Sequence, residues 1–487
     1  MARDIKLFHT LPPLLVPAIA ALVMYGVVLF APQVLYDADT FWHIAAGELM
    51  LDTRQVIHAD PFSHTMPGRE WQTHEWFSEI LMALAYRAAG WNGVVMLGGL
   101  AAGAAAALIA GWVARFAPPL TTIVTAILGL GALMPSLLVR PHMLAMPLMA
   151  LWVIALMLAR EKDRSPPLWL AAVMVLWANL HGSYVFGLAL IGPFALEALI
   201  AAPRARWVEV IWRWGLFGVL CLVAALVTPH GVEGLIHPFQ LMTMSSLPDI
   251  VEWRPTDFSK ARAFEAAIIA VLFVALTRGM RMPVLRLAVL LLLFHMALQH
   301  IRHVVPLGLV APLLLAEPVG KAVAAGFAGD LRLRLRPMLA LALVGLIGLT
   351  TARFIHPLVR KDGYHAPVSA FEAVPADLRG KPVLNSYGLG GYLIFKDAKV
   401  FIDGRADMYG DPFTKRYLRI ARGDTAELDK AIKEFDIQWM FLESNAILVR
   451  IMDNKDGWRR LYGDKVAVVY VRNGYGRSTS APSSTTR

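Results

Sequence analysis

The segment YDADTFWH, residues 36–43, places two carboxylates one residue apart, at Asp37 and Asp39, directly after a long apolar run. Ionisable side chains at the edge of a bilayer are costly unless they face a cavity, a partner or a reaction. Carboxylates are suited to accepting a proton or holding a divalent cation. A structural alternative exists for Asp39, because aspartate is a favoured N-cap and a helix is expected to begin near Thr40. Capping would explain one aspartate and not both.

The composition sets the class of protein. The chain has 487 residues, of which 57% are hydrophobic and 17% are charged, and its mean hydropathy is +0.54. These values indicate a polytopic membrane protein. The net charge of +10 falls largely in short loops between apolar runs, which argues against nucleic acid binding. Cys221 is the single cysteine, so no intramolecular disulfide can form.

Eleven apolar segments are candidate membrane helices, and several are shorter than a straight crossing needs. They are residues 11–31, 91–116, 120–138, 143–158, 167–180, 184–201, 214–227, 263–277, 283–298, 304–316 and 338–351. The first has Arg3 and Lys6 before it and no clear cleavage site, so we expect a retained helix. With a cytoplasmic N-terminus, the basic loops 160–164, 204–207, 277–282 and 332–336 all lie on the positive-inside face.

The same alternation sends polar, histidine-bearing helix ends to the outer face. These are "RPH" (140–142), "NLHGS" (179–183), "TPHG" (228–231) and "QHIRH" (299–303), together with the segment at 36–43. Their shared side predicts one polar site that opens outward. The alternative is that the individual side chains cap helices or reach lipid headgroups. The candidate substrate-binding residues are His43, Glu75, Arg140, His142, His181, His300, Arg302 and His303.

The first outer loop, residues 32–90, contains "DPFSHT" (60–65) and a segment at 71–91 in which apolar residues recur with helical spacing. Charged residues interrupt that segment, which favours an interfacial helix over a further crossing. The sequence therefore divides into a transmembrane domain at 1–352, an α/β domain at 353–475 outside the membrane, and a polar tail at 476–487 expected to be disordered.

Within the C-terminal domain, "KPVLN", "KVFID", "IQWMFLE" and "VAVVYV" are expected strands, and "TAELDKAIKEF" is an expected helix. The glycines of "SYGLGGYLIF" (386–395) indicate a tight turn or hairpin, because "YLIF" has strand composition. In "FIDGRADMYGD" (401–411), Asp403, Arg405 and Asp407 follow an expected strand, where α/β sheets present ligand groups. An internal ion pair that fixes the loop is the alternative.

The motifs together support a family resemblance. An Asp-x-Asp pair in the first outer loop, about eleven helices and an outer α/β domain resemble the GT-C superfamily of membrane glycosyltransferases. More narrowly, "DADTFWHIAAGELML", "DPFSHT", "HEWFSEIL", "WANLHGS" and "GGYLIF…VFIDGRADMYG" are similar to a group of bacterial GT-C-like membrane proteins. The resemblance covers most of the chain.

The resemblance implies a reaction and roles for residues. It implies transfer of a sugar from a polyprenyl-phosphate-linked donor to a glycan, glycolipid or protein acceptor outside the cytoplasmic membrane. Asp37 and Asp39 match the acidic pair, which acts as general base or holds Mg²⁺ or Mn²⁺. Arginines and histidines at the outer helix ends would stabilise the leaving phosphate. The spacing of His300 and His303 would allow both to share a helix face, but Arg302 between them opposes a bound cation.

Two other classes of function stay open. A transporter or flippase would show two related halves with matched broken helices, which the sequence lacks. A non-catalytic assembly protein of an envelope polysaccharide pathway would keep the fold without turnover.

Overall fold

The computed structural model describes residues 15–259, 263–323, 335–363 and 365–475. The expectations for Arg3, Lys6, most of the 332–336 loop and the 476–487 tail lie outside these residues. The chain forms two compact units. We call residues 15–35 and 74–358 the membrane unit, and residues 36–73 and 359–475 the sheet unit. Part of the first outer loop thus folds with the C-terminal domain.

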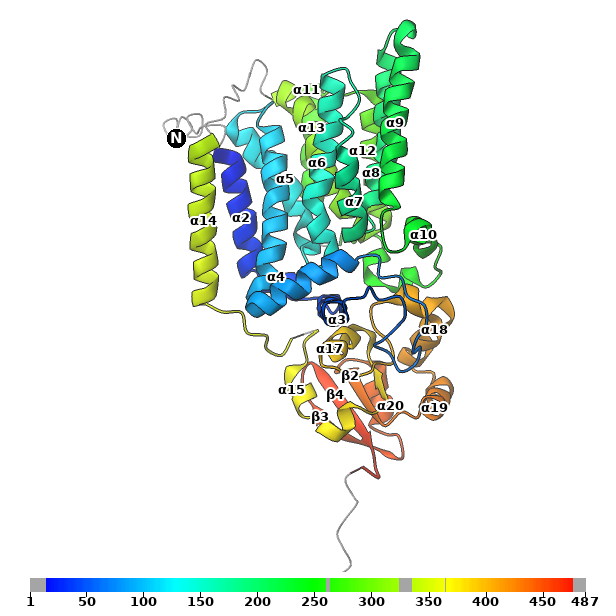
Figure 1. The fold of residues 1–487 in the computed structure, drawn as a ribbon. Helices are drawn as coiled ribbons and strands as arrows, with labels where there is room; N and C mark the ends of the chain where they lie inside the picture. Colours follow the sequence, from blue (N-terminus) through cyan, green and yellow to red (C-terminus); the bar gives the residue numbers. More distant parts are fainter. Residues whose placement is uncertain (1–14, 260–262, 324–334, 364, 476–487) are drawn as a thin grey trace, which may run out of the picture. The chain divides into compact units, whose positions relative to one another are not determined.

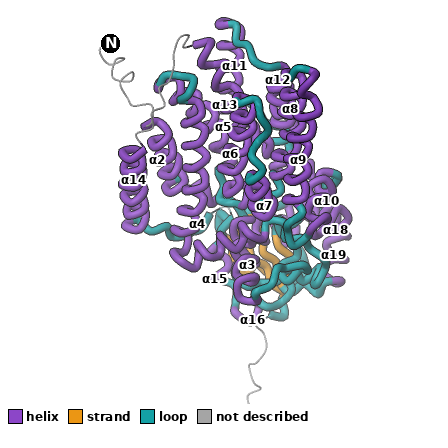
Figure 2. Tube along the Cα trace, turned by 45° about the horizontal axis from the view of Figure 1, so that its top comes forward, coloured by secondary structure: helices purple, strands orange, loops and turns teal. Residues whose placement is uncertain are grey.

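The membrane unit is helical, and its long helices run side by side (Figures 1 and 2). Its described α-helices are α2 (Leu15–Phe30), α4 (Trp76–Val113), α5 (Pro119–Leu133), α6 (Pro141–Glu161), α7 (Leu170–Leu180), α8 (Tyr184–Ala201), α9 (Trp207–Ala225), α10 (Gly231–Met242), α11 (Ala263–Arg278), α12 (Val284–Gln299), α13 (Val304–Val323) and α14 (Leu335–Ile355). Each of the eleven expected spans overlaps one of these helices. Helix α10 was not predicted. Seven helices in the described ranges are long and apolar enough to cross a membrane. The predicted polytopic helical class is confirmed.

Helix α4 contains a break. Ala89 and Gly90 leave the helical conformation, with φ of −150° and +57°. The helix expected over residues 71–91 therefore begins at Trp76, and the break separates it from the apolar segment that starts at Trp91. Glycine adopts positive φ without steric cost, which explains its place at this kink.

Asn179 joins three helices of the membrane unit. Its Oδ1 accepts a hydrogen bond from Trp76 Nε1 at 2.7 Å, and its Nδ2 donates to the carbonyl oxygens of Val175 and Val227 at 2.8 Å each. The bonds connect the start of α4 with the ends of α7 and α9. In a bilayer such bonds satisfy polar groups that have no water to bond to. Asn179 of the "NLHGS" motif is therefore structural.

The sheet unit contains the described strands of the chain (Figure 2). Their order is β1-β2-β4-β3, with β1 parallel to β2 and the other neighbours antiparallel. The elements are α3 (Asp39–Thr53), α15 (Val368–Glu372), α16 (Ala376–Arg379), β1 (Val383–Asn385), α17 (Gly390–Phe395), α18 (Ala406–Ala421), α19 (Thr425–Glu434), β2 (Trp439–Glu443), α20 (Ile447–Met452), β3 (Trp458–Gly463) and β4 (Ala467–Arg472). This confirms the predicted small C-terminal α/β domain.

Two local predictions in this unit are wrong. The "YLIF" segment forms helix α17 rather than a strand, since a short apolar run fits a buried helix as well as a strand. The "KVFID" segment is extended but forms only an isolated bridge between Val400 and Ser63. Its neighbour Phe401 donates its backbone N–H to Asn385 Oδ1 at 2.9 Å. The backbone of this segment thus bonds to a side chain and to the first loop instead of to the sheet. Edge strand β3, whose side chains are largely exposed, was not predicted.

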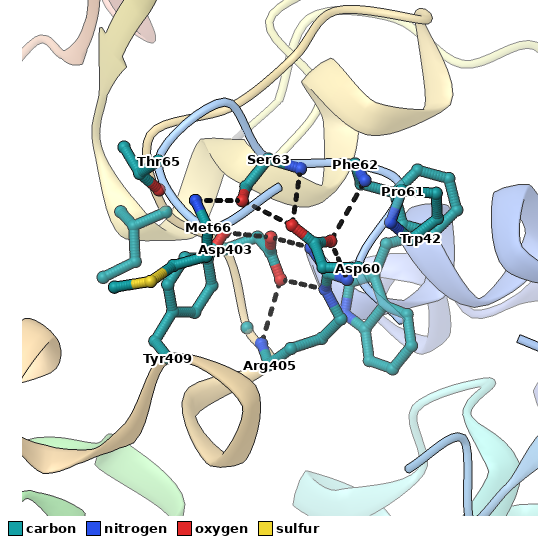
Figure 3. A network of polar contacts seen from close by, with 12 residues as sticks. Trp42, Asp60, Pro61, Phe62, Ser63, Thr65, Met66, Asp403, Arg405 and Tyr409 are labelled. Atoms are coloured by element: carbon teal, nitrogen blue, oxygen red, sulfur yellow. Dashed lines mark hydrogen bonds and ion pairs between the residues drawn. The ribbon is translucent and has the colours of Figure 1, made fainter. Parts of the chain in front are cut away.

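A buried ionic network joins the first loop to the C-terminal part of the sheet unit (Figure 3). Arg405 donates from Nη1 to Asp60 Oδ1 and from Nε and Nη2 to the two oxygens of Asp403, at 2.7 Å each. Asp60 also accepts from the backbone N–H groups of Phe62 and Ser63 at 3.0 Å. Tyr409 donates its hydroxyl to Asp403 at 2.7 Å. The exposed fractions of Asp60, Asp403 and Arg405 are 4%, 0% and 1%.

The two carboxylates keep Arg405 charged in this network. Burial disfavours the charged guanidinium, but Asp403 and Asp60 hold the pKa of Arg405 well above its ordinary value. Burial and the adjacent Asp403 carboxylate raise the pKa of Tyr409, which stays a neutral donor. The alternative of an internal ion pair at Asp403 and Arg405 is therefore the correct one.

We expect Arg405→Met to destabilise the sheet unit by about 3–5 kcal/mol, because it leaves two buried carboxylates without their counter-charge. Hydrogen exchange of the full-length protein in detergent should show lost protection over residues 58–66 and 399–411. Arg460→Met is the matched control, since the side chains of Arg460 and its partner Asp453 are 46% and 38% exposed, and we expect a change within about 1 kcal/mol. Equal protection in wild type and Arg405→Met would contradict the structural role.

Candidate active site

Asp37 and Asp39 have different local roles. Asp37 Oδ1 accepts the backbone N–H of Asp39 at 3.0 Å, and so caps the start of α3. Asp39 Oδ1 accepts from Trp42 Nε1, one turn further on, at 3.0 Å. Ala38 occupies the N-cap position and makes no side-chain cap. The capping alternative for Asp39 is therefore wrong, and the capping aspartate is Asp37.

Two glycines allow close packing around this helix start. A Cβ placed on Gly404 would lie 1.9 Å from Asp39 Oδ1, and one placed on Gly391 would lie 2.1 Å from the carbonyl oxygen of Ala38. Only glycine lets backbone approach so closely. The glycines of "GLGGY" and "DGRAD" thus fix the position of the acidic pair from the C-terminal part of the sheet unit.

His43 packs in the interior of the sheet unit. It is 1% exposed, and its ring centroid lies 3.6 Å from that of Trp42. Within this unit the structure gives His43 a packing role beside the acidic pair.

The membrane unit brings several predicted residues together. His181 Nε2 lies 3.3 Å from Glu75 Oε1, and its Nδ1 accepts the backbone N–H of Ser183 at 3.0 Å. These contacts require the tautomer protonated at Nε2. The ring of His142 lies 6.1 Å from that of His181, and its Nε2 is hydrogen-bonded to the carbonyl of Ser136 at 3.0 Å.

A second group surrounds Trp253, in the short helix η5 (Val251–Trp253). Arg302 Cζ lies 4.3 Å from the centroid of the Trp253 ring, a cation–π geometry. His300 Nδ1 is hydrogen-bonded to the Trp253 carbonyl at 2.6 Å. The His303 ring lies 5.4 Å from that of His300, and its Nδ1 is bonded to the carbonyl of Met296 at 3.3 Å.

Glu252 pairs with Arg140 and interacts electrostatically with Arg302. Arg140 Nη1 makes a short ion pair with Glu252 Oε1. Desolvation raises the pKa of Glu252, but the charges of Arg140 and Arg302 outweigh it and hold that pKa below its usual value. We call Glu75, Arg140, His142, His181, Glu252, Trp253, His300, Arg302 and His303 the polar cluster of the membrane unit.

Sequence reasoning missed Glu252 and Trp253. They lie in "VEWRP" (251–255), a stretch without histidine within the long segment that separates two apolar spans. An acid beside a tryptophan at an outer helix end was the available signal. The "TPHG" motif is a turn: the backbone N–H groups of His230 and Gly231 donate to Thr228 Oγ1, and Gly231 has φ +52°.

The donor set allows a divalent cation at the acidic pair. Mg²⁺ needs only one or two protein carboxylates when substrate phosphates complete its shell. Asp37 and Asp39 offer two, and across the described ranges no third acidic, histidine or cysteine ligand joins them in a cluster.

No family model matches the chain, and no curated protein matches it. A search of solved structures finds the crystal structure of ArnT from Cupriavidus metallidurans bound to undecaprenyl phosphate. The match covers 92% of this chain and 96% of ArnT, with a TM-score of 0.52 and 14% identical residues. At this identity the likeness concerns the fold. The chain therefore has an ArnT-like fold, which confirms the expected helical membrane fold with a small C-terminal α/β domain.

Proposed function

We propose that the protein is a membrane glycosyltransferase. It moves a sugar from a polyprenyl-phosphate-linked donor to an acceptor outside the cytoplasm, in envelope glycan or glycolipid synthesis. The ArnT-like fold supports this proposal, because the solved ArnT structure holds undecaprenyl phosphate. The positions of the basic loops support an orientation with the N-terminus in the cytoplasm and the C-terminal domain in the periplasm. The chain would then lie in the bacterial inner membrane.

The observation that carries the proposal is the state of Arg302. Its guanidinium lies over Trp253, and among the described residues no hydrogen bond or ion pair occupies its N–H donors. Arg140, by contrast, is paired with Glu252. A forked guanidinium held by an aromatic ring and still able to donate is suited to phosphate oxygens.

The reaction needs a base and a stabilised leaving group. The acceptor oxygen forms a bond to the anomeric carbon, while the bond from that carbon to the phosphate oxygen breaks and its electrons leave with the polyprenyl phosphate. Arg302 stabilises the charge that grows on this phosphate. A carboxylate of the acidic pair accepts the proton of the acceptor hydroxyl. Mg²⁺ or Mn²⁺ held by Asp37 and Asp39 would lower the pKa of a bound hydroxyl.

We expect Arg302→Gln to lower the rate of sugar transfer from a polyprenyl-phosphate donor by about 10²-fold, the scale for losing one preorganised donor to a developing charge. Arg302→Lys should recover part of the rate, since it keeps the charge and loses the fork. Arg254→Gln is the control, because this arginine next to Trp253 is exposed, and among the described residues its side chain donates only to the Asp249 carbonyl. Full activity of Arg302→Gln would contradict the proposed contact between Arg302 and the phosphate.

Asp37→Asn and Asp39→Asn test the acidic pair. Asparagine keeps an oxygen that can accept from the Asp39 backbone or from Trp42, so folding should survive while the negative charge is lost. We expect transfer to fall by about two or more orders of magnitude in at least one variant. Protein yield and detergent stability serve as controls. Normal transfer by both variants would leave the pair with a purely structural role.

Gly404→Ala tests the position of Asp39 without removing its charge. The added Cβ would clash with Asp39 Oδ1, and a displacement of about 1 Å in a catalytic group can cost about 10²-fold in rate. Gly380→Ala is the matched control, because nothing lies within 4 Å of its added Cβ. If Gly404→Ala and Gly380→Ala transfer sugar equally fast, the reaction does not depend on the placement of Asp39.

A further inference from the structure

A second charged site lies in the membrane unit, away from the polar cluster. A shallow recess forms where α6 ends and α9 begins, at the end of the bundle that carries two of the basic loops. Its charged lining is Arg160, Asp163, Arg164, Arg206, Glu209 and Arg213. We call it the arginine recess. Four guanidinium groups face two carboxylates, so the lining carries a net positive charge of two.

The two carboxylates are already engaged. Asp163 pairs with Arg206, and Glu209 lies 3.3 Å from Arg206 and 3.1 Å from Arg213. Arg164 has no ion-pair partner among the described residues. The recess therefore keeps guanidinium charge that its own acids do not neutralise.

Arg160 is the buried floor of the recess. Its side chain is 8% exposed, and its Nε lies 3.3 Å from Glu197 Oε1. Glu197 is shared with Arg286, which donates to both of its oxygens at 2.9 and 2.8 Å. One carboxylate thus serves two arginines. Nη1 of Arg160 lies 4.0 Å from Asp163 Oδ1, but it is buried and has no hydrogen-bond partner, which is costly for a charged donor.

The surroundings place the recess at the level of lipid headgroups. The first turns of α9 expose Trp207, Val208 and Trp212 by 41%, 80% and 70%. Tryptophans concentrate where hydrocarbon meets water, and exposed apolar residues beside them face lipid. Basic pockets between helices at this depth bind lipid phosphates.

We propose that the arginine recess binds the phosphodiester of an anionic phospholipid. One phosphodiester charge neutralises half of this excess positive charge, and its oxygens suit the forked guanidinium donors. A zwitterionic headgroup would bring an ammonium group that the same excess repels. The site is separate from the transfer reaction, and its occupancy does not depend on the proposed function.

Native mass spectrometry of the full chain in detergent tests the proposal, with phosphatidylglycerol and phosphatidylcholine as probes. We expect one phosphatidylglycerol to be retained in preference to phosphatidylcholine. Arg164→Gln combined with Arg213→Gln should weaken the apparent affinity for phosphatidylglycerol by about tenfold or more, given the contribution of each basic residue near a membrane. Both side chains lie on the exposed rim, so the fold should persist.

The matched control is Arg204→Gln combined with Arg281→Gln, which removes the same charge from exposed loop positions outside the recess. It should bind phosphatidylglycerol as wild type does. Equal loss in both double variants, or equal retention of phosphatidylcholine, would overturn the proposal. Displacement of the lipid by millimolar inorganic phosphate would also overturn it, because the site would then recognise a free anion.

Discussion

The sheet unit depends on one buried guanidinium. Arg405 lies between Asp60, from the first loop, and Asp403, from the C-terminal part of the chain. Buried charges cost several kcal/mol each in desolvation, and this cost is recovered only when geometry and hydrogen bonding are nearly complete. Here the carboxylates also accept backbone and tyrosine donors, and the Trp71 ring lies 4.5 Å from the Arg405 guanidinium carbon. The network joins segments more than 300 residues apart in sequence.

This junction has a consequence for the acidic pair. Asp37 and Asp39 begin α3, in the same stretch of chain as Asp60, and α3 packs against the glycines of the C-terminal part. A first loop tethered only at its ends would give two carboxylates no fixed position. Since preorganised placement is what makes a general base effective, the buried ion network and the close glycine contacts act together on the geometry of the candidate site.

Periodicity and apolar length predicted the helices of the membrane unit well, because the bilayer leaves few alternatives to a helix. The sheet unit was harder. Its "KVFID" segment has strand composition, but Asn385 and the first loop satisfy its backbone, and no local pattern encodes a partner so distant in sequence. "YLIF" became a helix for a similar reason: tertiary packing decided between two conformations that its composition allows equally. At the site, histidine-bearing helix ends predicted His181 and His300, whereas Glu252 and Trp253 lie in a stretch of sequence without histidine.

Polar residues that look alike in the sequence differ in their hydrogen bonds, and this difference distinguishes structural residues from candidate ligand-binding residues. The polar atoms of Asp60, Arg405 and Asn179 are hydrogen-bonded to other residues of the protein, and each residue joins separate elements of the fold. Arg302 lies over Trp253 with no hydrogen bond to the described residues, and the buried Nη1 atom of Arg160 has no hydrogen-bond acceptor. A buried or membrane-embedded donor without an acceptor costs free energy, and a protein recovers that cost when a ligand supplies the acceptor. This is the reason we propose that the two arginines bind phosphate oxygens, Arg302 those of the donor substrate and Arg160 those of a lipid.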